Sequence, residues 1–454
     1  MLYEKNDYLS TMRKVQTLFL LGAIWMLTAC PPMKNEPKSL DSALDSSEAS
    51  SILSANNMNR DTLFDKVYGM LLGAAIGDAM GAPTEMWTRH QMQLEYGHIQ
   101  GLDSMVREPS GEGTWDYNLP AGSTTDDTRW KALLVDFLTG SQKKNKSYQS
   151  ELDPKDFAVF LMNHYEEDIK ALKSVESYYP APFEAQMRKV NWLQEWAIVA
   201  KAYNEGDIDQ YAAALHKFYG GEMVCGGMLF APTVGAYYPS DPARAYEQSY
   251  RINIFDIGYA QDIGGLTAAM VAAAMDAQAK PSDILSVIRD IDPKGYFKSR
   301  LVGRTAYKVY QEALQLVYEA KLAKVGDIEP KDFPLAMAYK SPEDSLYYVQ
   351  LAKAYQLLDQ KLERYPFHPA EIHLVNLSAL LFTDFDFQKA LEFVINFGRD
   401  NDTTAAVTGS ILGAYHGASA LPQQLVQTVT SANLALGIDL KGMAERMTRV
   451  IVES

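Results

Sequence analysis

Two stretches of this chain carry a small residue at every fourth position, and this pattern limits the possible fold more than any other feature. The positions are Gly69, Gly73, Gly77 and Gly81 in the first stretch, and Ala405, Gly409, Gly413 and Gly417 in the second. Residues four apart share one face of an α-helix, where a glycine costs about 1 kcal/mol relative to alanine. Close approach of another backbone is the natural compensation. We therefore predict two helices deep in the core and hypothesise that they pack against each other. The first stretch contains Asp65, Lys66 and Asp78, which makes it too polar for a transmembrane interface.

The rest of the chain has helical periodicity. Apolar residues recur three and four positions apart, as at Phe157, Phe160 and Leu161, and strand-like alternation is scarce. Capping and breaking residues are frequent, for example Asp153-Pro154. These signals predict about a dozen or more helices in one large all-α domain over residues 61–454, with residues 318–366 as an elaboration on it.

Composition excludes several classes of protein. The formal net charge is −15 over 454 residues, and no basic cluster is longer than Lys143-Lys144. Binding of nucleic acid through a cationic face is therefore not expected. Two cysteines cannot form a disulfide scaffold, and we interpret Cys225 as a small buried hydrophobic residue. The histidines lack metal-ligand spacing, and we expect His368 and His373 to be partly solvated.

The N-terminal segment has the features of a targeting signal. Arg13-Lys14 precede an apolar run over residues 15–27, which is short for a membrane span and suits a signal peptide. The run ends in Leu-Thr-Ala-Cys at Cys30, which resembles the lipobox of bacterial lipoproteins. The expectation is a signal peptide over residues 1–30 that leaves a lipidated Cys30. A plain signal anchor with an incidental cysteine is the alternative.

The expected location follows from this signal. Residues 31–60 are rich in Ser, Asn, Asp and Pro and predict a flexible linker. The lipid on Cys30 would hold the domain on the bacterial cell envelope, at the outer membrane or the periplasmic face. Contact with the membrane is then expected through the lipid anchor alone.

Two acidic motifs lie where helices are expected to begin. One contains Asp126-Asp127 after Thr125, and the other contains Asp400 and Asp402. N-capping alone would explain one such residue per helix, but not adjacent carboxylates that repel one another. Carboxylate and hydroxyl oxygens favour Mg²⁺, Mn²⁺ or Ca²⁺ over zinc. As a pair on a packed core, the motifs predict a site for two ions.

Three motifs in order resemble the ADP-ribosylglycohydrolases, a family that includes the dinitrogenase reductase-activating glycohydrolase. The motifs are Gly77 to Glu85 (GDAMGAPTE), Thr125 to Thr128 (TDDT) and Gly398 to Thr403 (GRDNDT), and the resemblance spans residues 61–422. It implies an all-α bundle with a binuclear Mg²⁺ or Mn²⁺ centre. The metal ligands that it implies are Thr125, Asp126, Asp127, Asp400, Asp402 and Thr403.

The resemblance also implies a reaction. Family members cleave the bond between C1″ of a ribose and a nitrogen or oxygen of an ADP-ribosylated protein or small molecule. Such a bond breaks through an oxocarbenium-like state. Asp127 would orient the attacking water, and Glu85 would act as a proton donor or a gate. The residues expected to bind substrate are Asp78, Gly227, Tyr237 and Asp262.

The chain departs from the family pattern at two places. The glycine-rich stretch over residues 226–232 has no arginine, and residues 259–262 keep Asp262 but have no histidine. Two alternatives therefore stand beside an ADP-ribose substrate. One is the same metal centre acting on a non-nucleotide glycoside, and the other is a non-catalytic binding protein on this fold.

Overall fold

The regular secondary structure of the described residues is helical. The computed structural model describes residues 58–105, 108–113, 116, 118–140, 150–175, 180–328 and 342–453. Across these ranges the chain forms 17 α-helices and no sheet, with one isolated bridge between Met105 and Leu119. The all-α prediction is confirmed. The α-helices are α3 (Arg60–Gly81), α4 (Arg89–Glu95), α5 (Asp126–Thr139), α6 (Pro154–Lys173), α7 (Pro180–Glu205), α8 (Ile208–Leu215), α9 (Gly226–Tyr237), α10 (Pro242–Ile252), α11 (Ala260–Ala274), α12 (Pro281–Asp290), α13 (Thr305–Lys321), α14 (Pro342–Asp359), α15 (Pro369–Phe382), α16 (Phe387–Phe397), α17 (Asn401–His416), α18 (Gln423–Ala435) and α19 (Leu440–Val452).

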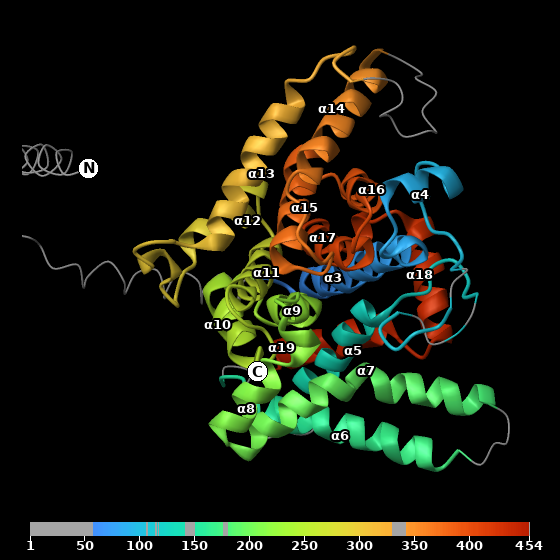
Figure 1. Ribbon diagram of the computed structural model, residues 1–454, viewed down its shortest axis with the longest axis vertical. Coiled ribbons are helices and arrows are strands. Elements are labelled where there is room, and N and C mark those ends of the chain that lie inside the picture. The colour runs from blue at the N-terminus through green and yellow to red at the C-terminus, as the bar shows by residue number, and fades with distance from the viewer. Residues whose placement is uncertain are drawn as a thin grey trace, which may run out of the picture. The chain divides into compact units, whose positions relative to one another are not determined.

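The two glycine-patterned helices, α3 and α17, pack backbone to backbone at the centre of the helical body (Figure 1). A Cβ added to Gly73 would lie 2.1 Å from the carbonyl oxygen of Gly409, and one added to Gly81 would lie 2.4 Å from Cα of Asp402. The pairing runs in opposite directions along the two helices, so they are antiparallel. This confirms the hypothesis that the two faces meet. It also places the N-terminus of α17 beside the C-terminus of α3.

A buried lysine ties α3 to the ends of two other helices. Lys66 Nζ donates to the backbone carbonyls of Ala274, Ala414 and Tyr415 at 2.9, 3.0 and 3.1 Å. These carbonyls belong to the last turns of α11 and α17, where the helix dipoles favour a cation. Burial lowers the pKa of Lys66 to about 8. The contact therefore fixes the end of the α3–α17 pair opposite Asp402.

Outer helices pack around this central pair. Helices α6 and α7 lie side by side as an antiparallel pair along one edge, and α13 and α14 lie together along another (Figure 1). Residues 318–366 include the end of α13 and all of α14, and Ala323, Ile328, Val349 and Ala352 there form a small separate apolar cluster. Along the described residues, no helix is long and apolar enough to cross a bilayer.

Candidate active site

Asp78 on α3 holds the N-terminal end of α5. Its carboxylate accepts hydrogen bonds from the backbone N–H groups of Thr125 and Thr128 at 2.9 and 3.0 Å, and from their hydroxyls at 3.0 and 2.6 Å. Burial raises the pKa of Asp78 to about 6, and the charge of Asp127 acts in the same direction. Asp78 is fully buried, and all four of these bonds are internal. These bonds give Asp78 a structural role in holding α5, and its contact with substrate stays a prediction.

The two acidic motifs meet beside Asp78. Thr403 Oγ1, in the first turn of α17, donates to Asp127 Oδ2 at 2.9 Å. Thr125 Oγ1, at the N-cap of α5, lies 3.3 Å from Asp402 Oδ2. The other oxygen of Asp402, Oδ1, is buried and has no hydrogen-bond partner among the described residues. Side chains some 277 positions apart in the chain are thus brought together at two helix N-termini.

The carboxylates at this junction raise one another's pKa. Burial is the largest cause for Asp400, whose pKa rises to about 7, and the charge of Glu85 is the next. The same two causes raise the pKa of Asp402 well above its ordinary value. For Asp126 the causes are burial and then the charge of Asp127. Ionising all of these groups together is costly without a cation or bound protons.

Lys131 and Arg129 lie near the carboxylates, and both are bonded within the protein. Lys131 Nζ donates to the backbone carbonyl of Asp127 at 3.0 Å and lies 3.4 Å from its Oδ1. Arg129 donates to the carbonyls of residues 111, 112 and 113 at 3.0, 3.1 and 2.8 Å. Burial lowers the pKa of Arg129 to about 10. The charges of Lys131 and Arg129 offset only part of the repulsion among the carboxylates.

The donors at this junction fit hard divalent cations. As placed in the described part of the chain, no three His, Cys, Asp or Glu side chains are arranged to hold an ion. The donors are nevertheless all carboxylate or hydroxyl oxygens, which Mg²⁺ and Mn²⁺ prefer. The unpartnered Asp402 Oδ1 is a buried lone-pair donor of this kind. An ion bound here would share the carboxylate oxygens of Asp127 and Asp402 with the hydroxyls of Thr403 and Thr125.

The N-terminus of α9 reaches the same acidic region. The backbone N–H of Gly227 donates to Asp256 Oδ2 at 3.0 Å, and Asn253 Nδ2 donates to the same oxygen at 2.8 Å. Burial raises the pKa of Asp256 to about 6. Cys225, at the N-cap of α9, is buried as predicted, and after burial the charge of Asp400 is the largest cause of its raised pKa. The predicted contact of Gly227 with substrate stays a prediction. Sequence reasoning missed Asp256, which appears in the sequence as a lone acid in an apolar run.

The structure does not bring Asp262 or Tyr237 to the acidic junction. Asp262 on α11 bonds instead to Arg304, at 2.6 and 2.9 Å, and to the hydroxyl of Tyr246 at 2.7 Å. Tyr237 is fully buried at the end of α9 opposite Gly227, so it presents no ring face to a ligand. Both side chains are buried, and their contact with substrate stays a prediction. Cys30, the predicted lipid attachment site, lies outside the described residues.

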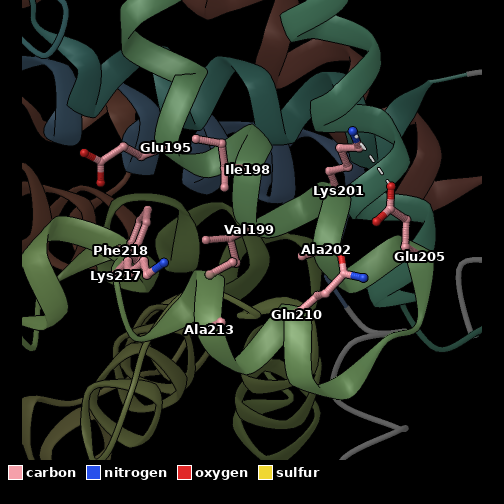
Figure 2. A pocket seen from close by; sticks show the side chains of 11 residues that line it. Glu195, Ile198, Val199, Lys201, Ala202, Glu205, Gln210, Ala213, Lys217 and Phe218 are labelled. Atoms are coloured by element: carbon pink, nitrogen blue, oxygen red, sulfur yellow. Dashed lines mark ion pairs between the residues drawn. The ribbon is translucent and has the colours of Figure 1, made fainter.

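A pocket lies on another part of the protein. It has a volume of about 630 Å³ and is bordered by the second half of α7, by α8 and by the turn η4 (Phe218–Gly221) (Figure 2). Apolar side chains such as Val199 share its lining with an ion pair between Lys201 and Glu205 at 3.9 Å. Glu195 and Phe218 line it on the side where η4 begins. None of the predicted site residues lines this pocket.

Comparison with known proteins agrees with this geometry. The family model for ADP-ribosylglycohydrolase matches residues 59–453. The chain belongs to the ADP-ribosylglycohydrolase family. It is 23% identical over 369 residues to the uncharacterised protein YegU of Escherichia coli (strain K12), covering 81% of this chain and 93% of that protein. A solved structure titled as an ADP-ribosylglycohydrolase-related protein complex has the same fold, with a TM-score of 0.50 and 17% identity over 86% of this chain and 99% of that one. Family membership indicates a hydrolase that acts on glycosidic bonds.

Proposed function

We propose that this protein is a divalent-metal-dependent glycohydrolase that cleaves the N- or O-glycosidic bond of ADP-ribose attached to a protein or a small molecule. Two Mg²⁺ ions, or Mn²⁺ in their place, are the proposed cofactors. The observation that carries the proposal is the meeting of the α5 and α17 N-termini at a buried set of oxygen donors. The proposed ligands are Thr125, Asp126, Asp127, Asp400, Asp402 and Thr403.

The residues around this set have distinct tasks in the proposed reaction. When bound, the metal pair supplies positive charge and lowers the pKa of water. Thr403 and Lys131 hold the Asp127 carboxylate in place, so that it can orient a water and accept its proton. Glu85, half-buried at the edge of the cluster, gives a proton to the leaving nitrogen or oxygen. Asp78 keeps the first turn of α5 aligned throughout.

A second candidate substrate is a glycoside without a pyrophosphate. Arg129, Lys131 and Arg399, which are cations near the carboxylates, are bonded within the protein. The N-terminus of α9 bonds to a carboxylate, that of Asp256, and residues 226–232 contain no arginine. A pyrophosphate placed here would meet carboxylates at short range, which favours a neutral glycoside. A purely binding protein is disfavoured, because buried carboxylates are costly to keep without a catalytic use.

Calorimetric titration of ADP-ribose into the purified chain, with Mg²⁺ and again with EDTA, separates these candidates. Binding that requires Mg²⁺ supports the nucleotide substrate and justifies assays on ADP-ribosylated proteins. No binding in either condition, with Mg²⁺ bound by its own titration, favours the neutral glycoside. A chain that binds no divalent metal favours the non-catalytic alternative.

We also propose that Cys30 is lipidated and anchors the protein to the bacterial cell envelope. The support is the sequence pattern alone: a basic pair, a short apolar run and a lipobox-like ending. Labelling with radioactive palmitate in a bacterial host should mark the wild-type protein and leave Cys30→Ser unlabelled. Equal labelling of Cys225→Ser controls for the second cysteine. An unlabelled wild-type chain would refute the anchor.

A further inference from the structure

Tyr219 connects three elements near the active site. It lies in η4 with φ 45° and ψ 42°, a left-handed conformation that a non-glycine residue seldom adopts. Its backbone N–H donates to Glu195 Oε2 of α7 at 2.9 Å, and its hydroxyl donates to the carboxylate of Glu112. Its ring packs against Trp196 and Phe218, with centroids 6.4 and 4.7 Å away. The side chain is thus held in one direction, with its hydroxyl toward the segment that precedes α5.

Glu112 is attached in turn to the first turn of α5. Its backbone carbonyl accepts a hydrogen bond from the N–H of Asp126 at 3.2 Å. Arg129, one turn further along α5, donates to the carbonyls on both sides of Glu112 as well as to its own. The segment 111–113 therefore cannot move without moving the N-terminus of α5. Tyr219 in η4 bonds to Glu112, and Glu112 bonds to Asp126, so the two hydrogen bonds link η4 to the first turn of α5.

We propose that Tyr219 and Glu112 are positioning residues that latch the Asp126 end of α5 in place for the reaction. The proposal rests on the proposed function for the reaction that it serves. The contacts carry this assignment: the Tyr219 hydroxyl donates to the carboxylate of Glu112, and the carbonyl of Glu112 accepts from the N–H of Asp126 at 3.2 Å. Burial and the charge of Glu112 raise the pKa of Tyr219, which keeps its hydroxyl protonated as a donor. The strained backbone at Tyr219 fits a conformation that is kept for this contact.

The latch is tested on the full chain by removing one hydroxyl. Tyr219→Phe keeps the ring packing and loses the bond to Glu112. The matched control is Tyr211→Phe on α8, which also loses one hydroxyl bond, to the carbonyl of Ile254 at 2.7 Å, without touching segment 111–113. Without metal, we expect hydrogen exchange at the Asp126 amide to be about tenfold faster in Tyr219→Phe and unchanged in Tyr211→Phe.

Metal affinity and a conservative variant complete the test. We expect the Mn²⁺ affinity to fall about tenfold in Tyr219→Phe and in Glu112→Ala. Glu112→Gln keeps a hydrogen-bond acceptor and should restore most of it. Wild-type exchange rates in both Tyr219→Phe and Glu112→Ala would overturn the latch, as would equal effects in Tyr211→Phe. A wild-type chain that binds no Mn²⁺ counts against the proposed function, and the metal-free exchange rates then decide the latch on their own.

Discussion

Single side chains decide whether this site can bind a cation. Asp402 has one oxygen 3.3 Å from the Thr125 hydroxyl and one buried oxygen without a partner among the described residues. Burial and then the charges of Glu85, Asp400 and Asp127 raise the pKa of Asp402, so ionising it without a bound cation costs free energy. Its retention is understandable if the same charge is used to bind metal. Removing the charge of Asp402 should therefore weaken metal binding and leave the metal-free protein as stable as before or more stable.

Asp402→Asn should reduce Mn²⁺ affinity at least a hundredfold, an estimate that corresponds to about 3 kcal/mol. The metal-free variant should keep its helical circular dichroism and unfold at the same or a higher temperature, since one buried charge is gone. Calorimetry with Mn²⁺ and thermal melts in EDTA measure both effects. Asp439→Asn, the same change at the exposed N-cap of α19, should alter neither quantity. Full Mn²⁺ affinity in Asp402→Asn would show that the ligand assignment is wrong.

His373 makes a separate prediction about pH, and it corrects the expectation that this histidine is solvated. Its ring is fully buried, and neither ring nitrogen has a hydrogen-bond partner in the part of the chain that the structure describes. Burial, followed by the charge of Arg304, lowers the pKa of His373 to about 3. As pH falls below the ordinary value of 6.5, the unfolded chain takes up a proton that the folded chain does not. The stability contributed by neutral His373 is complete above pH 6.5 and is lost as pH falls toward 3.

The comparison with His373→Leu isolates this effect from the acidic cluster, which titrates in both proteins. Between pH 6 and pH 4 the unfolding free energy of the wild type should fall relative to that of the variant, by about 1.4 kcal/mol per pH unit. Urea denaturation at several pH values measures the difference. If the difference in unfolding free energy between the two proteins stays constant across this range, His373 is hydrogen-bonded or solvated in the folded state.

At the scale of elements, the α3–α17 contact places the N-terminus of α17 beside the C-terminus of α3. Its spacing is set by glycines, because an added Cβ at Gly73 would overlap the carbonyl of Gly409. Gly73→Ala should therefore destabilise the protein by about 3 kcal/mol or more, as overpacking in a rigid core does. Gly101→Ala, where an added Cβ meets no atom within 4 Å, should change stability by less than about 1 kcal/mol. Chemical denaturation of both variants measures this, and equal stabilities would contradict a tight backbone contact.

At the scale of the whole molecule, metal binding should couple to folding. The proposed ligands come from α5 and α17, so an ion bound between their N-termini would join distant parts of the chain. A ligand that binds only the folded state at a hundred times its Kd adds about 2.7 kcal/mol. Saturating Mn²⁺ should accordingly raise the melting temperature, and EDTA should reverse the rise. Asp402→Asn should show no rise, whereas an equal rise in this variant would point to metal bound elsewhere.

Much of this architecture was readable from local patterns. Helical periodicity and four-residue glycine spacing depend on which side chains share a helix face, and this is a property of nearby residues. The two acidic motifs likewise predicted oxygen donors at the starts of two helices. For this reason the all-α fold, the paired central helices and the family were predicted correctly, while the metal remains a prediction.

Other features depended on contacts between residues far apart in the chain. In the structure, Asp78 accepts hydrogen bonds from the first turn of α5, and Asp262 forms an ion pair with Arg304. The link from Tyr219 through Glu112 to Asp126 joins three segments whose sequences show no common signal. A buried charge must find its counter-charge or hydrogen-bond donor wherever the packed helices place one. Local sequence therefore specifies the helices and the donor chemistry, whereas only the tertiary packing decides which carboxylates meet at the N-termini of α5 and α17 and which bond to other parts of the fold.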